Sequence, residues 1–191
     1  VIAMCDSNGY IYDKDGVDIA VIQDLKEVRR ARIKEYVSAR PSAEYHEGFR
    51  GIWTIPCDIA LPCATQNEIE LDAANALIQN GCWMVCDGYN MPSTLEAMES
   101  FEQAGILFVP SKAANAGGVA VSALEMSQNS LRLSWTFEEV DQRLQSIMAN
   151  IYQNMSSAAA EYGKSADDFV SGANVAAFLK VSNAMMAQGI V

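Results

Sequence analysis

Basic residues are scarce in this 191-residue chain, which carries 13 Lys and Arg against 24 Asp and Glu, for a formal net charge of −11. Binding to nucleic acid requires clustered Lys and Arg that neutralise phosphates, so this balance argues against a nucleic-acid partner. One basic cluster is present, at residues 26–34 (KEVRRARIK). It is interpreted either as the solvated face of a helix or as an anion-binding segment, and the sequence leaves both interpretations open.

Long apolar runs and metal-binding motifs are also missing. No apolar run approaches the roughly 18 residues of a membrane-spanning helix, and no signal peptide is visible, so no membrane partner is expected. The five cysteines are odd in number and scattered through apolar stretches, which predicts reduced thiols in a cytoplasmic protein. Without a Cys-x-x-Cys pair, and with His46 as the single imidazole, we expect neither a metal site nor Ser/His or Cys/His catalysis.

The first 110 residues alternate short apolar runs with longer amphipathic ones. We expect strands at residues 1–5, 58–61, 83–86 and 106–109, and helices at residues 18–39, 70–80 and 93–105. Gly81 and Gly105 mark helix ends, and Ser93 with Glu96 has the spacing of a capping box. Strands that alternate with helices predict an α/β fold with a parallel sheet and right-handed crossovers.

The remainder of the chain has a different pattern. All five prolines lie before position 111, and from Ala116 onward the apolar spacing is helical. Thr136 and Glu139 have capping-box spacing and open a long predicted helix that ends at Gly163, before a last helix at residues 167–187. We therefore predict a nucleotide-binding part at residues 1–115 and a helical part at residues 116–191.

Polar residues follow the predicted strands, where ligands of open α/β sheets bind. After the first strand, Asp6 is suited to accept from a ribose hydroxyl and Ser7 to donate to a 2′-phosphate that Lys26 or Arg30 would neutralise. The alternative for this segment is a plain turn, since Asp, Ser, Asn and Gly are usual turn residues.

Later strand ends add further candidates. Ala64, Thr65 and Gln66 follow the strand at residues 58–61 and are expected to face a ligand crevice, unless they only cap their own loop. Asn90 follows the strand at residues 83–86 and offers both a donor and an acceptor. Gly117 and Gly118 open a helix whose free N–H groups suit a carboxylate or phosphate, and Asn115 and Ser122 add side-chain hydrogen bonds there.

Several of these segments together resemble one family. They are DSNGYIYD (residues 6–13), DIALPCATQNE (58–68), the Gly-x-Asn-Met-Pro run (88–92), KAANAGGVAVSALEMSQNS (112–130) and SGANVAAFLKVSNAMMAQGIV (171–191). In this order, and over essentially the whole chain, they resemble the hexameric glutamate dehydrogenases of the Glu/Leu/Phe/Val dehydrogenase family.

The resemblance implies a Rossmann-like domain and the reversible oxidative deamination of L-glutamate to 2-oxoglutarate and ammonium. It implies NADP as cofactor, with NAD possible because Asp6 lies beside Ser7. It places Asp6, Ser7 and Lys26 at the adenosine side, Ala64, Thr65 and Gln66 along the cofactor cleft, and Asn90 near the nicotinamide ribose. It places Asn115, Gly118, Val119 and Ser122 around the nicotinamide end and the substrate carboxylates.

The resemblance also implies parts that the printed sequence lacks. No G-x-G-x-x-G fingerprint occurs, and we expect it, with the first strand of the fold, to precede Val1. The family's catalytic lysine and aspartate belong to an earlier domain, toward which the C-terminal helical part would return. We therefore assign no catalytic residue to this chain, and expect it to be inactive alone and part of a homohexamer in the full-length enzyme. The alternatives are a leucine, phenylalanine or valine dehydrogenase, or a non-catalytic nucleotide-binding module.

Overall fold

The computed structural model describes residues 1–189 of the chain. These residues form two compact units, which are treated separately. Unit 1 comprises Val1–Ala60, Asn67–Trp83 and Ser93–Ile106, and unit 2 comprises Leu61–Gln66, Met84–Pro92 and residues 107–189. The division near residue 115 that the sequence suggested stays a prediction.

Unit 1 opens with a small antiparallel sheet of order β1-β2-β3. Its strands are β1 (Ala3–Cys5), β2 (Gly9–Tyr12) and β3 (Glu44–Glu47). The sequence predicted β1 but neither β2 nor β3, and the described partner of β1 is antiparallel. The chain reverses directly after β1, through a turn in which the Asp6 N–H donates to the carbonyl of Gly9 at 2.9 Å. So short a connection permits only antiparallel pairing, because a parallel crossover needs a dozen or more residues.

The single helix predicted at residues 18–39 was wrong. The segment instead consists of α1 (Ile19–Gln23), a π-helical turn η1 (Asp24–Val28), a 3₁₀ turn η2 (Ile33–Glu35) and α2 (Tyr36–Ala39). Arg30 has a left-handed backbone with φ of +54°, which interrupts the helix. The Ala31 carbonyl and the Ile33 N–H then bond to the side chains of Lys26 and Asp6 instead of to a helix. Side chains that take backbone groups in this way compete with regular helix formation.

The core of the first 60 residues gathers on one side of these short helices. Ile11 from β2, Leu25 from η1, Ile33 from η2 and Tyr36 from α2 are each at most 2% exposed and belong to one hydrophobic cluster. Their burial holds the irregular segment in one conformation, since each such side chain contributes roughly 1.5–3 kcal/mol.

The rest of unit 1 contains η3 (Arg50–Thr54), the two-residue strand β4 (Ile59–Ala60), α3 (Leu71–Gln79) and α4 (Leu95–Ala104). The predicted helix ends are confirmed, because Gly81 and Gly105 have left-handed φ values of +80° and +72°. The predicted capping residue of α4 was wrong by one position. Thr94 caps the helix by accepting from the Ala97 N–H, whereas Ser93 is buried in a parallel bridge with Ile69.

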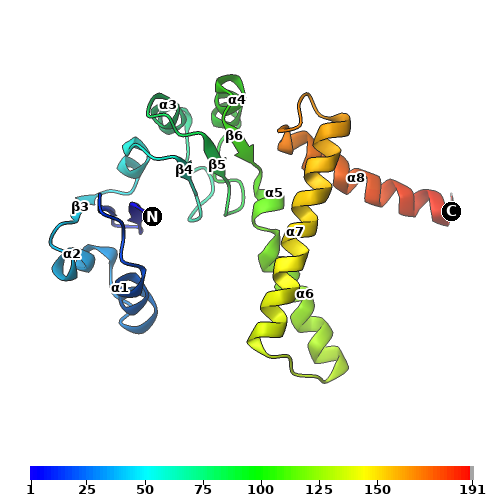
Figure 1. The fold of residues 1–191 in the computed structure, drawn as a ribbon, viewed down its shortest axis with the longest axis horizontal. Helices are drawn as coiled ribbons and strands as arrows, with labels where there is room; N and C mark the ends of the chain where they lie inside the picture. Colours follow the sequence, from blue (N-terminus) through cyan, green and yellow to red (C-terminus); the bar gives the residue numbers. More distant parts are fainter. Residues whose placement is uncertain (190–191) are drawn as a thin grey trace. The chain divides into compact units, whose positions relative to one another are not determined.

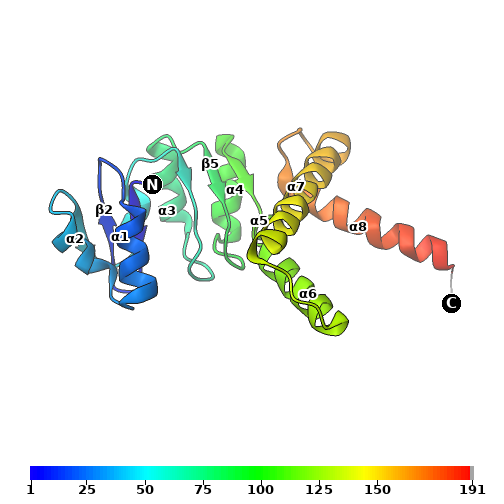
Figure 2. The same cartoon turned by 60° about the horizontal axis from the view of Figure 1, so that its bottom comes forward.

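Unit 2 contains the parallel strand pair β5 (Met84–Cys86) and β6 (Leu107–Val109), which confirms the expected α/β class. Four helices follow: α5 (Ser111–Ala114), α6 (Ala116–Leu131), α7 (Phe137–Tyr162) and α8 (Phe169–Gln188). The capping box of Thr136 and Glu139 is confirmed, and so is the end of α7 at Gly163. Figures 1 and 2 show the N-terminal end of α8 packed on α7, from which the rest of α8 then diverges.

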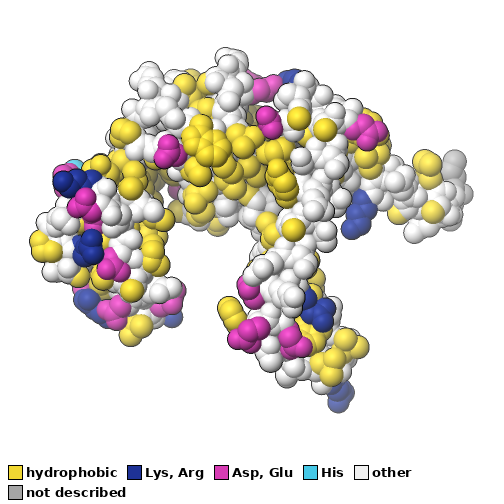
Figure 3. Space-filling view, viewed as in Figure 1, with side chains coloured by type: hydrophobic (Ala, Val, Ile, Leu, Met, Phe, Trp, Pro, Cys, Tyr) yellow, Lys and Arg dark blue, Asp and Glu magenta, His cyan; other side chains and the backbone are white. Residues whose placement is uncertain are grey.

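The helices of unit 2 differ in how much they bury. Ala113 of α5, Met155 and Ala159 of α7 and Phe169 of α8 form a core cluster. In contrast, α6 has no buried residue, and Val119 and Met126 are 71% and 68% exposed. Figure 3 shows hydrophobic side chains beside acidic ones on the surface where α6 and α7 meet. Among the described residues, no helix is long and apolar enough to cross a membrane.

Candidate functional site

The Asp6 loop (residues 6–8, between β1 and β2) is the first predicted ligand-binding segment, and it lies in unit 1. The Asp6 carboxylate accepts from the Lys26 Nζ at 3.0 Å, from the Ile33 N–H at 2.8 Å and from the Asn8 N–H at 3.1 Å. The structure therefore brings together Asp6 and Lys26, which the sequence assigned to one subsite. It also shows that η1 and η2 converge on this loop.

The environment of Asp6 favours its charged form. Burial by itself disfavours ionisation, but the hydrogen bonds from Ile33, Asn8 and Lys26 outweigh it, so the pKa of the Asp6 carboxyl lies below its ordinary value. The Asp6 side chain is only 10% exposed. A carboxylate that is covered and bonded in this way serves mainly to shape the loop, which leaves it little capacity for a ribose hydroxyl.

Ser7 meets a partner that the sequence reasoning missed. The Arg32 Nη1 donates to the Ser7 Oγ at 2.8 Å, and Ser7 in turn donates to the Asn8 Oδ1 at 3.2 Å. Arg32 is exposed and lies within the basic cluster at residues 26–34, which was the available signal. The neighbouring Arg29 is committed elsewhere, since it forms ion pairs with Asp24 and Glu35. The Asp6 loop thus carries a hydroxyl and two cations on its surface.

The second group of predicted residues lies in unit 2, beginning with Ala64, Thr65 and Gln66. All three are exposed, just after a segment in which Pro62 is buried. The Gly88 N–H donates to the Pro62 carbonyl at 2.9 Å, which fixes the segment against the loop after β5. A Cβ atom on Gly88 would lie 2.4 Å from the Cys63 Sγ, so any other residue at this position would require the Cys63 side chain to move.

Two cysteines near these loops, Cys57 and Cys86, have surroundings that favour the protonated thiol. Burial raises the pKa of the Cys86 thiol, and the nearby Asp87 and Cys63 add to the effect. The hydrogen bond with Cys82, together with burial, raises the pKa of Cys57. Thiols with raised pKa values stay protonated at neutral pH and react slowly. All five cysteines are free thiols, and the described residues contain no group of His, Cys, Asp and Glu suited to a metal ion.

Asn90, predicted near the nicotinamide ribose, and Asn115, predicted around the nicotinamide end and the substrate carboxylates, are brought together in unit 2. The Asn115 Nδ2 donates to the Asn90 Oδ1 at 2.6 Å and to the Tyr89 carbonyl at 3.1 Å. Asn115 is also the residue that precedes α6, and it makes no side-chain cap bond there. Its amide therefore fixes the loop after β5 instead of capping α6, while the Gly118 N–H donates to the Asn115 carbonyl at 3.2 Å.

The remaining predicted residues line the outward side of α6. Gly117 faces α7, because a Cβ atom there would lie 3.1 Å from Leu144, whereas a Cβ on Gly118 would meet no atom within 4 Å. Val119 and Ser122 are exposed, and the Ser122 Oγ donates only to the Gly118 carbonyl within the helix, at 3.2 Å. A small ligand can therefore approach the backbone at Gly118 and the Ser122 hydroxyl without displacing other side chains.

Comparison with known proteins decides the family. A family model described as Glutamate/Leucine/Phenylalanine/Valine dehydrogenase matches residues 1–189. The chain belongs to the Glu/Leu/Phe/Val dehydrogenase family. The glutamate dehydrogenase of Bacteroides thetaiotaomicron is 53% identical over all of this chain, and the NADP-specific glutamate dehydrogenase of Helicobacter pylori is 49% identical over 99% of it.

The fold agrees with solved structures of this dehydrogenase family. A crystal structure of Plasmodium falciparum glutamate dehydrogenase matches 100% of this chain with a TM-score of 0.90 at 45% identity. The chain spans 43% of the length of the two bacterial relatives and 41% of the Plasmodium chain. The Rossmann-like fold class expected from the sequence is thereby confirmed.

Proposed function

We propose that this chain is the cofactor-binding part of a glutamate dehydrogenase, which converts L-glutamate and water to 2-oxoglutarate and ammonium with reduction of NADP⁺. The relatives that match the whole chain carry the name glutamate dehydrogenase, which supports glutamate as substrate. When bound, the nicotinamide ring of the cofactor accepts the hydride, and the protein supplies binding and orientation. No catalytic acid or base is assigned to the described residues.

The chemistry of the Asp6 loop fits the adenosine end of NADP. The guanidinium of Arg32 donates a hydrogen bond to the Ser7 hydroxyl. The ammonium of Lys26 donates to the carboxylate of Asp6, the residue before Ser7. Guanidinium, ammonium and hydroxyl donors are the groups that bind a phosphate, here the 2′-phosphate. In an NAD-specific dinucleotide fold, an acidic residue at the position of Asp6 instead accepts from the ribose hydroxyls. Because three donors already occupy the Asp6 carboxylate, this loop is better suited to NADP than to NAD.

The residues of unit 2 are proposed to serve the other end of the cofactor and the substrate. Thr65, Gln66 and Asn90 follow strand ends, where ligands of α/β sheets bind, and with Ala64 they would contact the cofactor. The start of α6 is the positive end of its helix dipole, which suits the negative charge of a substrate carboxylate. Gly118 and Val119 would shape the pocket there, and the hydroxyl of Ser122 would donate to the carboxylate. Asn115 would link the two groups of residues through its bond to Asn90.

The test of this function is a substrate comparison with the full-length protein that carries this chain. We expect reduction of NADP⁺ with glutamate, and rates at least about tenfold lower with leucine, phenylalanine or valine, since apolar side chains cannot replace hydrogen bonds to a second carboxylate. Equal or higher rates with leucine would overturn the assignment to glutamate. Binding of NADP⁺ without turnover of any of these amino acids would support a non-catalytic module instead.

Cofactor preference is tested by Lys26→Glu, with Lys34→Glu as the matched control. Both changes reverse one charge in the same basic cluster, but Lys34 is exposed on η2, outside the bonds of the Asp6 loop. We expect Lys26→Glu to raise the KM for NADP⁺ about tenfold or more, which corresponds to ~1.4 kcal/mol, and the KM for NAD⁺ much less. Equal increases for the two cofactors, or an equal effect of Lys34→Glu, would show that Lys26 does not recognise the 2′-phosphate.

A further inference from the structure

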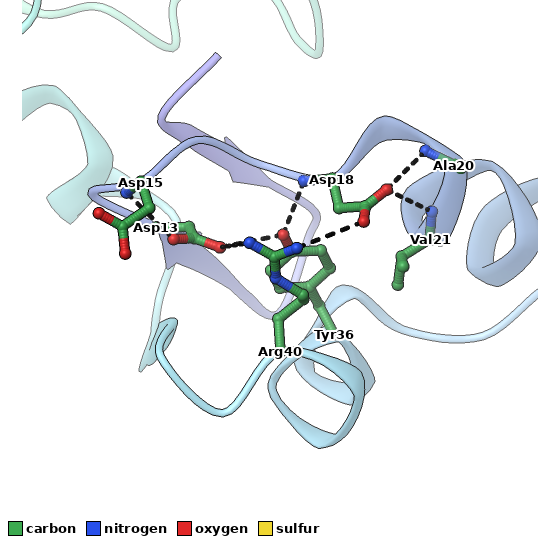
Figure 4. A network of polar contacts seen from close by, with 7 residues as sticks. All are labelled: Asp13, Asp15, Asp18, Ala20, Val21, Tyr36 and Arg40. Atoms are coloured by element: carbon green, nitrogen blue, oxygen red, sulfur yellow. Dashed lines mark hydrogen bonds and ion pairs between the residues drawn. The ribbon is translucent and has the colours of Figure 1, made fainter.

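A buried carboxylate in unit 1 has no part in the proposed subsites. Asp13, directly after β2, is 0% exposed and is surrounded by partners (Figure 4). The Tyr36 hydroxyl donates to its Oδ2 at 3.1 Å, the Asp15 N–H donates to its Oδ1 at 3.2 Å, and Arg40 forms an ion pair with it at 3.8 Å. A buried charge is costly unless it is paired and hydrogen-bonded, so a buried carboxylate at this position points to a specific role for its network of partners.

Tyr36 connects this carboxylate to the start of α1. Its hydroxyl, which donates to Asp13, also accepts from the Asp18 N–H at 2.7 Å. The Asp18 carboxylate caps α1 by accepting from the Ala20 and Val21 N–H groups at 3.1 and 3.3 Å. Burial raises the pKa of Tyr36, and the hydrogen bond to Asp13 and its negative charge add to this effect against the opposing hydrogen bond from the Asp18 N–H, so the hydroxyl stays protonated as a donor. One hydroxyl therefore joins the end of β2 to the first residues of a helix.

That helix leads directly to Lys26. The backbone of α1 continues without a break into η1, since both Gln23 and Asp24 have right-handed helical angles. Leu25, next to Lys26, is 1% exposed in the same core cluster as the Tyr36 ring. A short helix that is pinned at its start and packed in its middle can transmit the position of its cap to its far end, where Lys26 bonds to Asp6.

Tyr36 also follows directly after η2, the second segment that contacts the Asp6 loop. It begins α2 immediately after η2, whose first residue, Ile33, donates its N–H to Asp6 and is preceded by Arg32. The Tyr36 side chain is 0% exposed, so it holds the end of this segment in place. The two segments that supply cations to the Asp6 loop, η1 and η2, are thus both connected to one buried tyrosine.

We infer that Tyr36 is a positioning residue for NADP, because its hydroxyl fixes α1 and η2 so that Lys26 and Arg32 remain beside Ser7 where the 2′-phosphate binds. This inference rests on the proposed function. Removal of the hydroxyl leaves the Asp18 N–H without its partner and Asp13 without one of its donors, so the segment relaxes. The cations then spend less time at the Asp6 loop, while the remainder of the nucleotide site is unchanged.

The experiment compares two nucleotides on the full-length enzyme. Adenosine 2′,5′-bisphosphate carries the 2′-phosphate, and adenosine 5′-monophosphate lacks it. Tyr36→Phe keeps the ring that fills the core and removes only the hydroxyl. Tyr12→Phe is the matched control, because Tyr12 lies in β2 next to Asp13 but outside this network. Calorimetry should show that Tyr36→Phe weakens binding of the bisphosphate about threefold to tenfold, the range of a lost hydrogen bond, and of the monophosphate less than about twofold.

The alternative outcomes are distinct. A merely structural role would weaken both nucleotides equally, and an unchanged bisphosphate affinity would also overturn the inference. If the wild-type enzyme binds the two nucleotides equally, NADP specificity fails and the inference fails with it. Should Tyr36→Phe not fold, Arg40→Gln decides. Arg40 is 36% exposed and pairs with Asp13 and Asp18, so its replacement should reduce bisphosphate affinity selectively but less. No selective loss in Arg40→Gln would then overturn the inference.

Discussion

The Asp6 loop of unit 1 and the start of α6 in unit 2 are both candidate anion sites, but they are built in opposite ways. In the Asp6 loop, the Asp6 carboxylate accepts from Lys26 and from the Ile33 N–H, and the Ser7 hydroxyl accepts from the Arg32 guanidinium. At the start of α6, Gly118 and Ser122 are exposed, and the serine hydroxyl bonds only to its own helix. The Asp6 loop is held together by its recognition residues. The start of α6 exposes its recognition residues on a helix that would fold without them.

This difference separates stability from binding. Where recognition residues also hold the fold, a substitution should lower both the free energy of unfolding and the affinity for ligand. Where they lie on the outer face of a helix, a substitution should change ligand affinity alone. Exposed hydrogen bonds within a helix contribute little, whereas a buried group that loses its partner costs about 1–3 kcal/mol.

The largest effect is expected for Asp6→Ala. This change leaves the Ile33 N–H without its acceptor and the Lys26 ammonium with only the Ala31 carbonyl, so we expect the free energy of unfolding to fall by about 2–3 kcal/mol at pH 7. Because the pKa of Asp6 is lowered in the folded state, its contribution is complete above the unfolded value of about 3.9 and is lost as the pH falls through the folded value. Denaturant unfolding at a series of pH values measures both effects.

Asp15→Ala is the control for this prediction. Asp15 is also in unit 1, but it is exposed and contributes only its backbone N–H to the Asp13 network. Its replacement should change stability by less than about 0.5 kcal/mol, as is usual at the surface. If Asp6→Ala were no more destabilising than Asp15→Ala, the Asp6 loop would not be held together by its carboxylate, and the contrast with α6 would disappear.

The sequence predicts regular elements of this chain well where local signals agree. The capping box of Thr136 and Glu139 and the glycine at position 163 define α7, because both signals act within one turn of helix. Gly105 ends α4 for the same reason, since it takes a left-handed conformation that other residues avoid. In unit 2, the structure joins Asn90 and Asn115, two residues that the sequence proposed separately, through a hydrogen bond.

The parts that were missed depend on contacts between distant residues. Nothing local in residues 18–39 indicates that Asp6 will take the N–H of Ile33, 27 positions later, and so break the helix. Arg32 was hidden within a basic cluster that is equally typical of a solvated helix face. Ser93 has the right spacing for a cap, but its place in a bridge with Ile69 removes it from that role and leaves it to Thr94.

A smaller effect is expected for Asn115→Ala, which tests the link between the loop after β5 and α6. The change removes both hydrogen bonds of the Asn115 amide, so the loop that carries Asn90 should become more mobile. We expect kcat/KM for glutamate to fall about tenfold, and stability by no more than about 1 kcal/mol, because these bonds are exposed. Asn129→Ala, an exposed asparagine at the other end of α6, should leave both quantities unchanged. A fall of more than about 1 kcal/mol in the free energy of unfolding, with kcat/KM nearly unchanged, would show that Asn115 supports the fold as the residues of the Asp6 loop do.

The smallest effect is expected for Ser122→Ala, which has a close control in Ser127→Ala. Both serines lie on α6, are exposed and donate to the carbonyl four residues earlier, at Gly118 and Ala123. Alanine is the better helix former, so each change should alter stability equally, by less than about 0.5 kcal/mol. Only Ser122→Ala should raise the KM for glutamate, by about threefold to tenfold, because only that hydroxyl lies beside Gly118 where a carboxylate is proposed to bind. Identical KM values for the two variants would remove Ser122 from the substrate site, while unequal stabilities would show that its hydroxyl supports the fold as Asp6 does in unit 1.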